Sequence, residues 1–138
     1  MKRFEVVEHT SDVGIRAYGD SMAEAFENCA VGMMSLMLDP GRVETRRRVE
    51  LSARGMDAKS LLVAWLSEIL YRVEAEGCAF ASFEVGEIDE VAVAGWGEGE
   101  PLDAVKHAAA LEIKAPTYHM LELGEREGVW TAQVIFDV

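Results

Sequence analysis

The spacing of apolar and polar positions changes several times along the chain, and each change predicts an element. Residues 3–8 and 13–19 have the short alternating pattern of β-strands and are separated by a polar turn. Ser21 opens a capping-box sequence with Glu24, which predicts the start of a helix. The apolar residues that follow recur at helical spacing until Asp39-Pro40-Gly41 ends the pattern: Met22, Ala25, Phe26, Cys29, Met33 and Met37.

The rest of the chain returns to strands after one more helix. Residues 42–53 alternate in polarity, as a strand does. A second helix is expected from Asp57, a suitable N-cap, to Gly77, a suitable residue after the last turn. Further strands are expected at 79–88, 90–96, 110–123 and 129–138.

The last of these strands has one apolar face. Trp130, Ala132, Val134 and Phe136 would face the core, while Asp137 would point the other way with Gln133 and Ile135. Strands and helices do not alternate strictly, and hairpin-like pairs close the chain. We therefore expect a two-layer α+β fold, with two helices packed on one face of a mixed or antiparallel sheet. No linker or repeat divides residues 1–138, so a single domain is expected.

The charge narrows the classes of partner. The formal net charge is −12, which opposes tight binding to nucleic acid and suits a basic protein surface or a cation. No stretch approaches the roughly 20 apolar residues of a membrane-spanning helix. The first residues turn acidic too early for a signal peptide, so we expect a cytoplasmic protein without a membrane association.

The end of the chain carries an unusual concentration of negative charge. The final strand runs to the last residue, so the α-carboxylate of Val138 lies next to the Asp137 carboxylate. Two such anions repel each other unless a cation or a set of donors lies between them. Asp12, in the turn after the first strand, would add a third anionic group if the two strands were neighbours. Carboxylate oxygens are ligands for Ca²⁺ or Mg²⁺. Asp12 alone is also explained as a turn residue that caps local amides.

The remaining candidate groups have simple structural interpretations. Cys29 and Cys78 match no metal-ligand spacing, so buried free thiols are expected in preference to a disulfide or a nucleophile. His9, His107 and His119 are too scattered for a histidine-rich metal site, and Thr117-Tyr118-His119 is expected in mid-strand.

Two conspicuous runs and the known catalytic motifs add no chemistry. The sequence from Gly95 to Glu100 lacks the lysine of a phosphate-binding loop and is expected to be a turn. Arg46-Arg47-Arg48 alternates across a strand and is expected to be a solvated or edge-strand charge run. No catalytic triad order, nucleophile elbow or dinucleotide fingerprint is present, so the residues by themselves support no named reaction.

Several motifs together resemble the archease family over the whole length of the chain. They are His9-Thr10-Ser11-Asp12-Val13-Gly14-Ile15, Trp65-Leu66-Ser67-Glu68-Ile69-Leu70, Lys114-Ala115-Pro116-Thr117-Tyr118-His119 and the closing Phe136-Asp137-Val138. Ser11 stands where alanine is usual, and Pro116 stands where a β-branched residue is usual. Proline lacks a backbone donor, so Pro116 suggests an edge strand or a bulge.

The resemblance implies a function that the residues alone do not. Archeases assist the RNA-splicing ligase that joins tRNA halves and other cleaved RNAs, and they promote guanylylation and multiple turnover of that enzyme. The Mn²⁺, the GTP and the catalytic histidine belong to the ligase, so a non-enzymatic activator is expected. The family's metal site, carried over residue by residue, falls on Asp12, Asp137 and the Val138 carboxylate. Ca²⁺ is the favoured ion, with Mg²⁺ or Mn²⁺ as alternatives.

Two other functions stay open at this stage. One is a metal-dependent hydrolase that uses the same carboxylates, although no base or nucleophile is evident near them. The other is a general chaperone or assembly module, which suits the acidity and the seven methionines but needs no carboxylate site.

Overall fold

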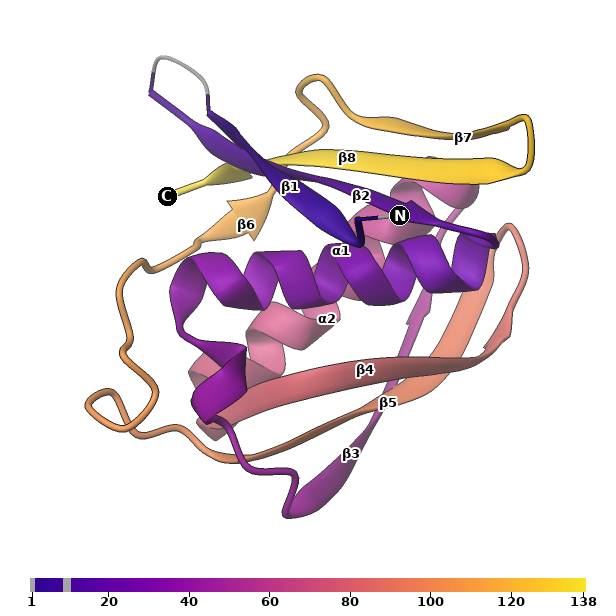
Figure 1. Ribbon diagram of the computed structural model, residues 1–138. Coiled ribbons are helices and arrows are strands. Elements are labelled where there is room, and N and C mark those ends of the chain that lie inside the picture. Colours follow the sequence, from indigo (N-terminus) through magenta and orange to yellow (C-terminus); the bar gives the residue numbers. More distant parts are fainter. Residues whose placement is uncertain (1, 9–10) are drawn as a thin grey trace.

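The computed structural model describes residues 2–8 and 11–138, which form two antiparallel sheets and two long helices (Figure 1). In chain order the elements are β1 (Phe4–Glu8), β2 (Val13–Gly19), α1 (Met22–Met37), η1 (Pro40–Arg42), β3 (Arg47–Arg54), α2 (Ala58–Glu76), β4 (Cys78–Ile88), β5 (Ala92–Pro101), β6 (Ala115–Pro116), β7 (Glu122–Arg126) and β8 (Val129–Asp137).

The strands divide between the sheets by position in the chain. One sheet has the order β1-β2-β8-β6, with β7 also paired to β8, and the other has the order β3-β5-β4. Helix α1 contacts β2 of the first sheet and β4 of the second, while α2 packs mainly on β3 (Figure 1). The α+β class is therefore confirmed, and the expected single sheet is replaced by two antiparallel sheets joined through the helices.

Local signals fix the ends of both helices. The Ser21 hydroxyl accepts a hydrogen bond from the Glu24 amide at 3.1 Å, and Asp57 and Ser60 form a reciprocal capping box at the start of α2. Helix α2 ends where Gly77 takes a left-handed conformation with φ of 64°, which costs a glycine little. The fully buried Trp65 then joins the helices, because its indole N–H donates to the Phe26 carbonyl at 3.3 Å.

The turn predicted from Gly95 to Glu100 is wrong, because these residues lie within β5. Glycine occupies alternate positions there, and large side chains of β4 fill the space that a side chain would need. A Cβ atom on Gly97 would lie 2.6 Å from a ring carbon of Phe80, closer than packing permits. These glycines therefore serve close packing between β4 and β5 rather than a change of direction.

The strand predicted over residues 110–123 is also wrong. Only Ala115 and Pro116 pair with β8 in this segment, and β7 begins at Glu122. Residues 109–114 are extended without a strand partner, and Met120 turns the chain with a positive φ of 54°. Pro116 lies at the edge of its sheet, as its missing amide predicted.

The remaining expectations for the strands are mostly confirmed. In β8, Ala132, Val134 and Phe136 are buried, but Gln133 and Ile135 on the opposite face are buried as well. β3 is an edge strand and carries the exposed Arg47 and Arg48, whereas Arg46 precedes it. Cys29 and Cys78 are buried free thiols. In the described part of the chain, no helix combines the length and apolar character that crossing a membrane requires.

Candidate metal centre at the end of the chain

The pairing of β2 with β8 brings Asp12 to the end of the chain. The two strands are antiparallel, with Val13 opposite Phe136. The next position outward in this register places Asp12 opposite Asp137. Directly opposed residues in an antiparallel pair have Cα atoms roughly 4.5–5.5 Å apart. The condition under which the sequence placed both carboxylates at one site, that their strands be neighbours, is therefore met.

A third strand fixes the backbone at Asp137. Ala115 of β6 pairs with Asp137, and the carbonyl oxygen of Asp137 accepts a hydrogen bond from the Lys114 amide at 2.8 Å. Val138 follows directly, with 41% of its surface exposed. Figure 1 shows this terminus beside β6, at the same end of the sheet as the connection between β1 and β2. The last residues thus extend from an ordered strand into solvent.

The two aspartate side chains have no competing partner among residues 2–8 and 11–138. No hydrogen bond or ion pair joins either carboxylate to another residue in that part of the chain. Opposed like charges on neighbouring strands destabilise a sheet. A cation between them would remove this repulsion, and carboxylate oxygens suit Ca²⁺ and Mg²⁺. The donor chemistry therefore fits a hard divalent ion.

The terminal carboxylate is essential to this assignment. The described residues contain no group of three or more His, Cys, Asp or Glu side chains able to hold a metal ion. Asp12 and Asp137 supply two anionic side chains, and the α-carboxylate expected at Val138 would supply the third anionic group. His9 and Thr10, in the first family-like motif, lie outside the described residues.

The predicted mid-strand position of Thr117-Tyr118-His119 is wrong. Thr117 directly follows β6, and its hydroxyl donates to the Ile135 carbonyl at 2.7 Å. The His119 amide in turn donates to the Thr117 hydroxyl at 3.3 Å, so these residues form a turn. Tyr118 is 62% exposed. The two-residue length of β6 places this turn at the surface near the end of β8.

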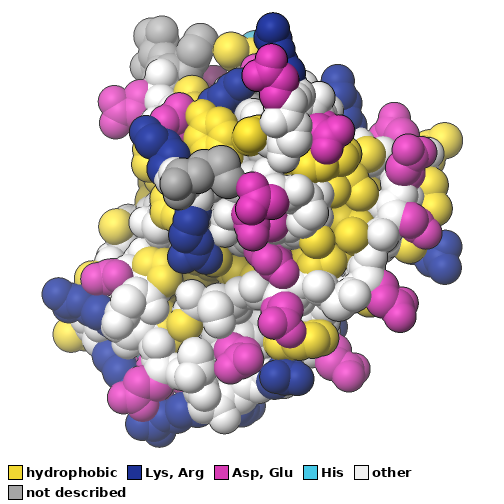
Figure 2. Space-filling view, turned by 45° about the vertical axis from the view of Figure 1, so that its right-hand side comes forward, with side chains coloured by type: hydrophobic (Ala, Val, Ile, Leu, Met, Phe, Trp, Pro, Cys, Tyr) yellow, Lys and Arg dark blue, Asp and Glu magenta, His cyan; other side chains and the backbone are white. Residues whose placement is uncertain are grey.

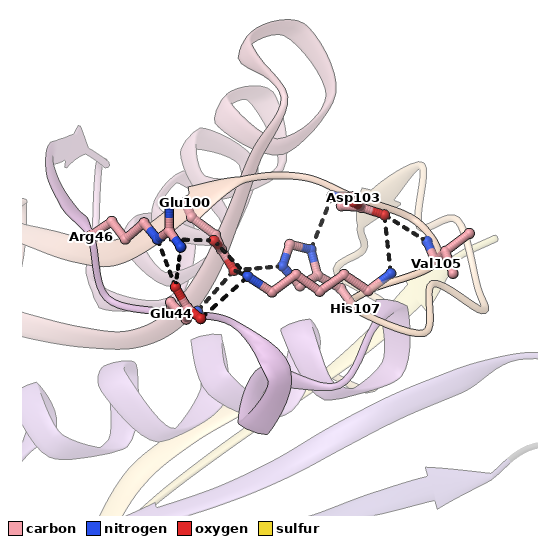
Figure 3. Close-up of polar contacts among 7 residues, drawn as sticks. Glu44, Arg46, Glu100, Asp103, Val105 and His107 are labelled. Carbon is pink, nitrogen blue, oxygen red and sulfur yellow. Dashed lines mark hydrogen bonds and ion pairs between the residues drawn. The ribbon is translucent and has the colours of Figure 1, made fainter.

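A second cluster of charged groups surrounds Glu100 and was not found from the sequence (Figure 3). Glu100 is only 6% exposed, and its carboxylate accepts hydrogen bonds from the Glu44 amide at 2.9 Å and from the Lys106 ammonium at 3.0 Å. These bonds and a contact with His107 lower the pKa of Glu100 to about 2. Glu100 is therefore a charged group whose hydrogen-bonding capacity is already used.

His107 fixes the loop that follows β5 to this carboxylate. Its ring is fully buried, and Nε2 lies 2.8 Å from a Glu100 oxygen. Nδ1 accepts a hydrogen bond from the Asp103 amide at 3.0 Å, so the neutral ring carries its proton on Nε2 and donates it to Glu100. The His107 carbonyl also accepts from the Asp39 amide at 2.8 Å. The cluster joins the loop, β5 and the end of α1, and its role is structural.

The acidic residues elsewhere do not form one continuous surface on the face drawn in Figure 2. There, acidic side chains lie singly among basic and apolar ones. Several acids are paired with bases, as in the contact of Arg16 with Glu122 at 3.4 Å. On the face that Figure 2 shows, the net charge of −12 is thus distributed rather than concentrated in a patch.

Comparison with known proteins assigns the chain to a family. Residues 4–138 match the model of the Archease protein family (MTH1598/TM1083). Two proteins called "Protein archease" are similar over nearly their whole length: that of Methanosarcina mazei is 41% identical, covering 99% of this chain and 97% of its own, and that of Pyrococcus furiosus is 36% identical, covering 100% of both.

Two solved structures share the fold. The solution structure of protein 1598 from Methanobacterium thermoautotrophicum has a TM-score of 0.81 and 37% identity, and the match covers 100% of both chains. The crystal structure of an archease from Thermotoga maritima, described as a possible chaperone, has a TM-score of 0.63 and 21% identity, covering 96% of this chain and 94% of that one. The family model and the relatives above 30% identity show that this chain belongs to the archease family.

Proposed function

We propose that this protein is a non-enzymatic activator of an RNA-splicing ligase, and that it holds one divalent cation at the end of its chain. The observation that carries the proposal is the position of Asp12 opposite Asp137 in the β2–β8 register, in a member of the archease family. The carboxylates of Asp12 and Asp137 and the terminal carboxylate of Val138 would hold the ion. Ca²⁺ is favoured over Mg²⁺ because it accepts larger and less regular oxygen shells.

The proposed role of this site is to act on the ligase rather than on RNA. An exposed group of carboxylates at the end of a sheet suits the cation-rich surface of a nucleotide-binding enzyme. The protein's net charge of −12 opposes direct contact with phosphates, so we expect weak and salt-dependent binding to bare RNA. A ligase that works on cleaved tRNA also implies a cytoplasmic site of action.

The cysteines favour an activator over a hydrolase with a thiol nucleophile. Burial raises the pKa of Cys29 to about 12, so this thiol is neutral at physiological pH. Burial also raises the pKa of Cys78. Neither group is available as a nucleophile, and the carboxylates of the proposed metal centre are assigned to holding the ion.

The test is the formation of ligase-GMP from labelled GTP in the presence of Mn²⁺. Catalytic amounts of this protein should increase both the rate of guanylylation and the number of ligation turnovers. Asp12→Asn, Asp137→Asn and a short extension after Val138 should each reduce activation at least about tenfold, because each removes one negative charge from the metal site. Glu125→Gln is the matched control, since it removes an exposed carboxylate from β7. Equal activation by the extended and unextended proteins would reject a role for the chain end.

A general chaperone is the second candidate, because the Thermotoga maritima archease is described as a possible chaperone. A chaperone would protect an unrelated unfolded protein from aggregation, and neutralising Asp12 or Asp137 would not alter that protection. Suppression of aggregation of heat-treated citrate synthase, followed by light scattering, separates this function from ligase activation.

A further inference from the structure

A groove runs along α2 beside the extended segment of residues 109–116. Its first hollow, of about 480 Å³, lies between the end of α1, Val73 of α2 and residues 109–112. Its second hollow, of about 200 Å³, lies between Leu70 and Tyr71 of α2 and residues 114–116. Glu74 lines both hollows, so they adjoin each other along the same helix.

The walls of the groove are apolar and partly open to solvent. Leu70 and Val73 are at most 5% exposed and contribute to the first layer of the core. Tyr71 is 57% exposed at the second hollow, and Leu102 is 39% exposed at the first. Large exposed apolar side chains beside a hollow are typical of a surface that binds a partner.

The segment beside the groove has free backbone donors. The Ala110 amide donates to the Met37 carbonyl at 2.9 Å, and the Lys114 amide donates to the Asp137 carbonyl at 2.8 Å. Between these two fixed points, the amides of 111–113 donate no hydrogen bond to any residue that the structure describes. The fully buried side chain of Ile113 anchors the segment to the core. The result is an extended, anchored stretch of chain without a strand partner.

The charge of the groove selects its occupant. Glu74 and Glu112 line the first hollow, and none of the described residues that line it is basic. Lys114 lies at the far end, in the second hollow. A ligand with a positive charge next to Glu74 would therefore be complementary to the middle of the groove.

We propose that this groove binds an extended peptide segment of a partner protein by strand addition to residues 111–113. The two hollows centre on positions about four residues apart, or roughly 13 Å along an extended chain. The peptide would place an apolar side chain in each hollow, with a Lys or Arg midway between them on the same face, next to Glu74. Backbone hydrogen bonds would supply affinity, and the hollows and the carboxylate would supply specificity. This binding requires no metal and does not depend on the proposed activation of a ligase.

The probe is the peptide acetyl-Ser-Leu-Thr-Lys-Thr-Leu-Ser-amide, titrated into the full-length protein labelled with ¹⁵N. We expect amide shifts at residues 109–116 and α2, and slower hydrogen exchange at the amides of 111–113 once the peptide is bound. Glu74→Lys should weaken binding about fivefold or more, because an attraction becomes a repulsion. Tyr71→Ala should weaken it several-fold, while Glu125→Lys makes the same change of charge on β7 and should have little effect.

Control experiments separate this proposal from its competitors. A peptide with both leucines replaced by serine should not bind detectably, and its binding with equal affinity would overturn the proposal. Equal losses in Glu74→Lys and Glu125→Lys would show only non-specific attraction between charges. If sedimentation shows a dimer and the amides of 111–113 are already protected in the free protein, a second copy of this chain fills the groove and the proposal is wrong. Asp12→Asn should leave peptide binding unchanged, so failure at the metal site remains distinguishable.

Discussion

Two groups of carboxylates in this molecule have opposite environments. Around Glu100, a carboxylate that is 6% exposed accepts hydrogen bonds from an amide, an ammonium and an imidazole. At the end of the chain, Asp12 and Asp137 lie opposite each other and make no hydrogen bond or ion pair with residues 2–8 or 11–138. The first arrangement neutralises a charge within the protein, and the second leaves charge available for a ligand.

The difference shows why burial and a shifted pKa do not by themselves identify a functional site. The pKa of Glu100 is lowered because its donors come from the protein, and the same donors leave no position for a ligand. Asp137 combines exposure, an opposed like charge and a backbone fixed by β6, which are the properties of a site prepared for an external cation. The predictions below test this contrast, beginning with the largest expected effect.

The largest effect should be on metal affinity at the chain end. Calorimetry with Ca²⁺ should detect one site, and Asp137→Asn, Asp12→Asn or an extension after Val138 should each weaken binding by about tenfold or more, or about 1.4 kcal/mol. The reason is the loss of one anionic oxygen group from a small set of ligands. Glu100→Gln should not change this affinity. A protein that binds no Ca²⁺, Mg²⁺ or Mn²⁺ at millimolar concentration would contradict the assignment.

The next effect should be on stability at the Glu100 cluster. Glu100→Gln removes the charge that Lys106 and His107 contact, and it should lower Tm by several degrees without altering metal binding. The pKa of Glu100 in the folded protein, about 2, lies below its usual 4.5. Its contribution to the free energy of unfolding is therefore fully present above about pH 4.5 and is lost as the pH falls toward 2.

Thermal unfolding at a series of pH values measures this contribution. The difference in Tm between the parent protein and Glu100→Gln should be constant above pH 5 and should shrink as the pH falls from 4.5 toward 2. A difference that stays constant through this range would show that the carboxylate charge is not what stabilises the loop.

The accuracy of the sequence-based predictions follows from the range of the interactions involved. Ser21, Asp57 and Gly77 act within a few residues of their own position, and all three caps were predicted correctly. The glycines of β5 were misread as a turn because their function is to accommodate side chains of β4, which are distant in sequence. Residues 110–123 failed as a strand for a related reason, since their pattern of side chains gives no information on whether a neighbouring strand exists.

The candidate sites divide in the same way. Asp137 and Val138 were identified because they adjoin in the sequence, and Asp12 joined them only on condition that β2 and β8 pair, which they do. The Glu100 cluster needs residues from β5, from the loop after it and from the segment before β3. No spacing in the sequence relates those segments, so the hydrogen bonds of Glu100 could be found only in the structure.

A smaller effect, of opposite sign to that at Glu100, is expected at the chain end without metal. Asp12→Asn removes the repulsion between directly opposed carboxylates, so it should raise Tm by about 1–3 °C in a buffer containing EDTA. Saturating Ca²⁺ should reverse the order, because the parent protein then gains more from binding than the variant does. Unfolding in EDTA and in Ca²⁺ measures both. A lower Tm for Asp12→Asn in EDTA would show that Asp12 is a structural turn residue.

The smallest effect should follow the loss of a carboxylate that belongs to neither cluster. Glu125 is exposed on β7 opposite Trp130, and no ion pair joins it to the described residues. Glu125→Gln should change the free energy of unfolding by less than about 0.5 kcal/mol and leave Ca²⁺ affinity unchanged. It alters net charge by the same amount as Asp12→Asn, Asp137→Asn and Glu100→Gln, so it measures the effect of charge alone. If Glu125→Gln weakened Ca²⁺ binding as much as Asp137→Asn does, the ion would be responding to the overall negative field of the protein, and the contrast between the two clusters would have no functional meaning.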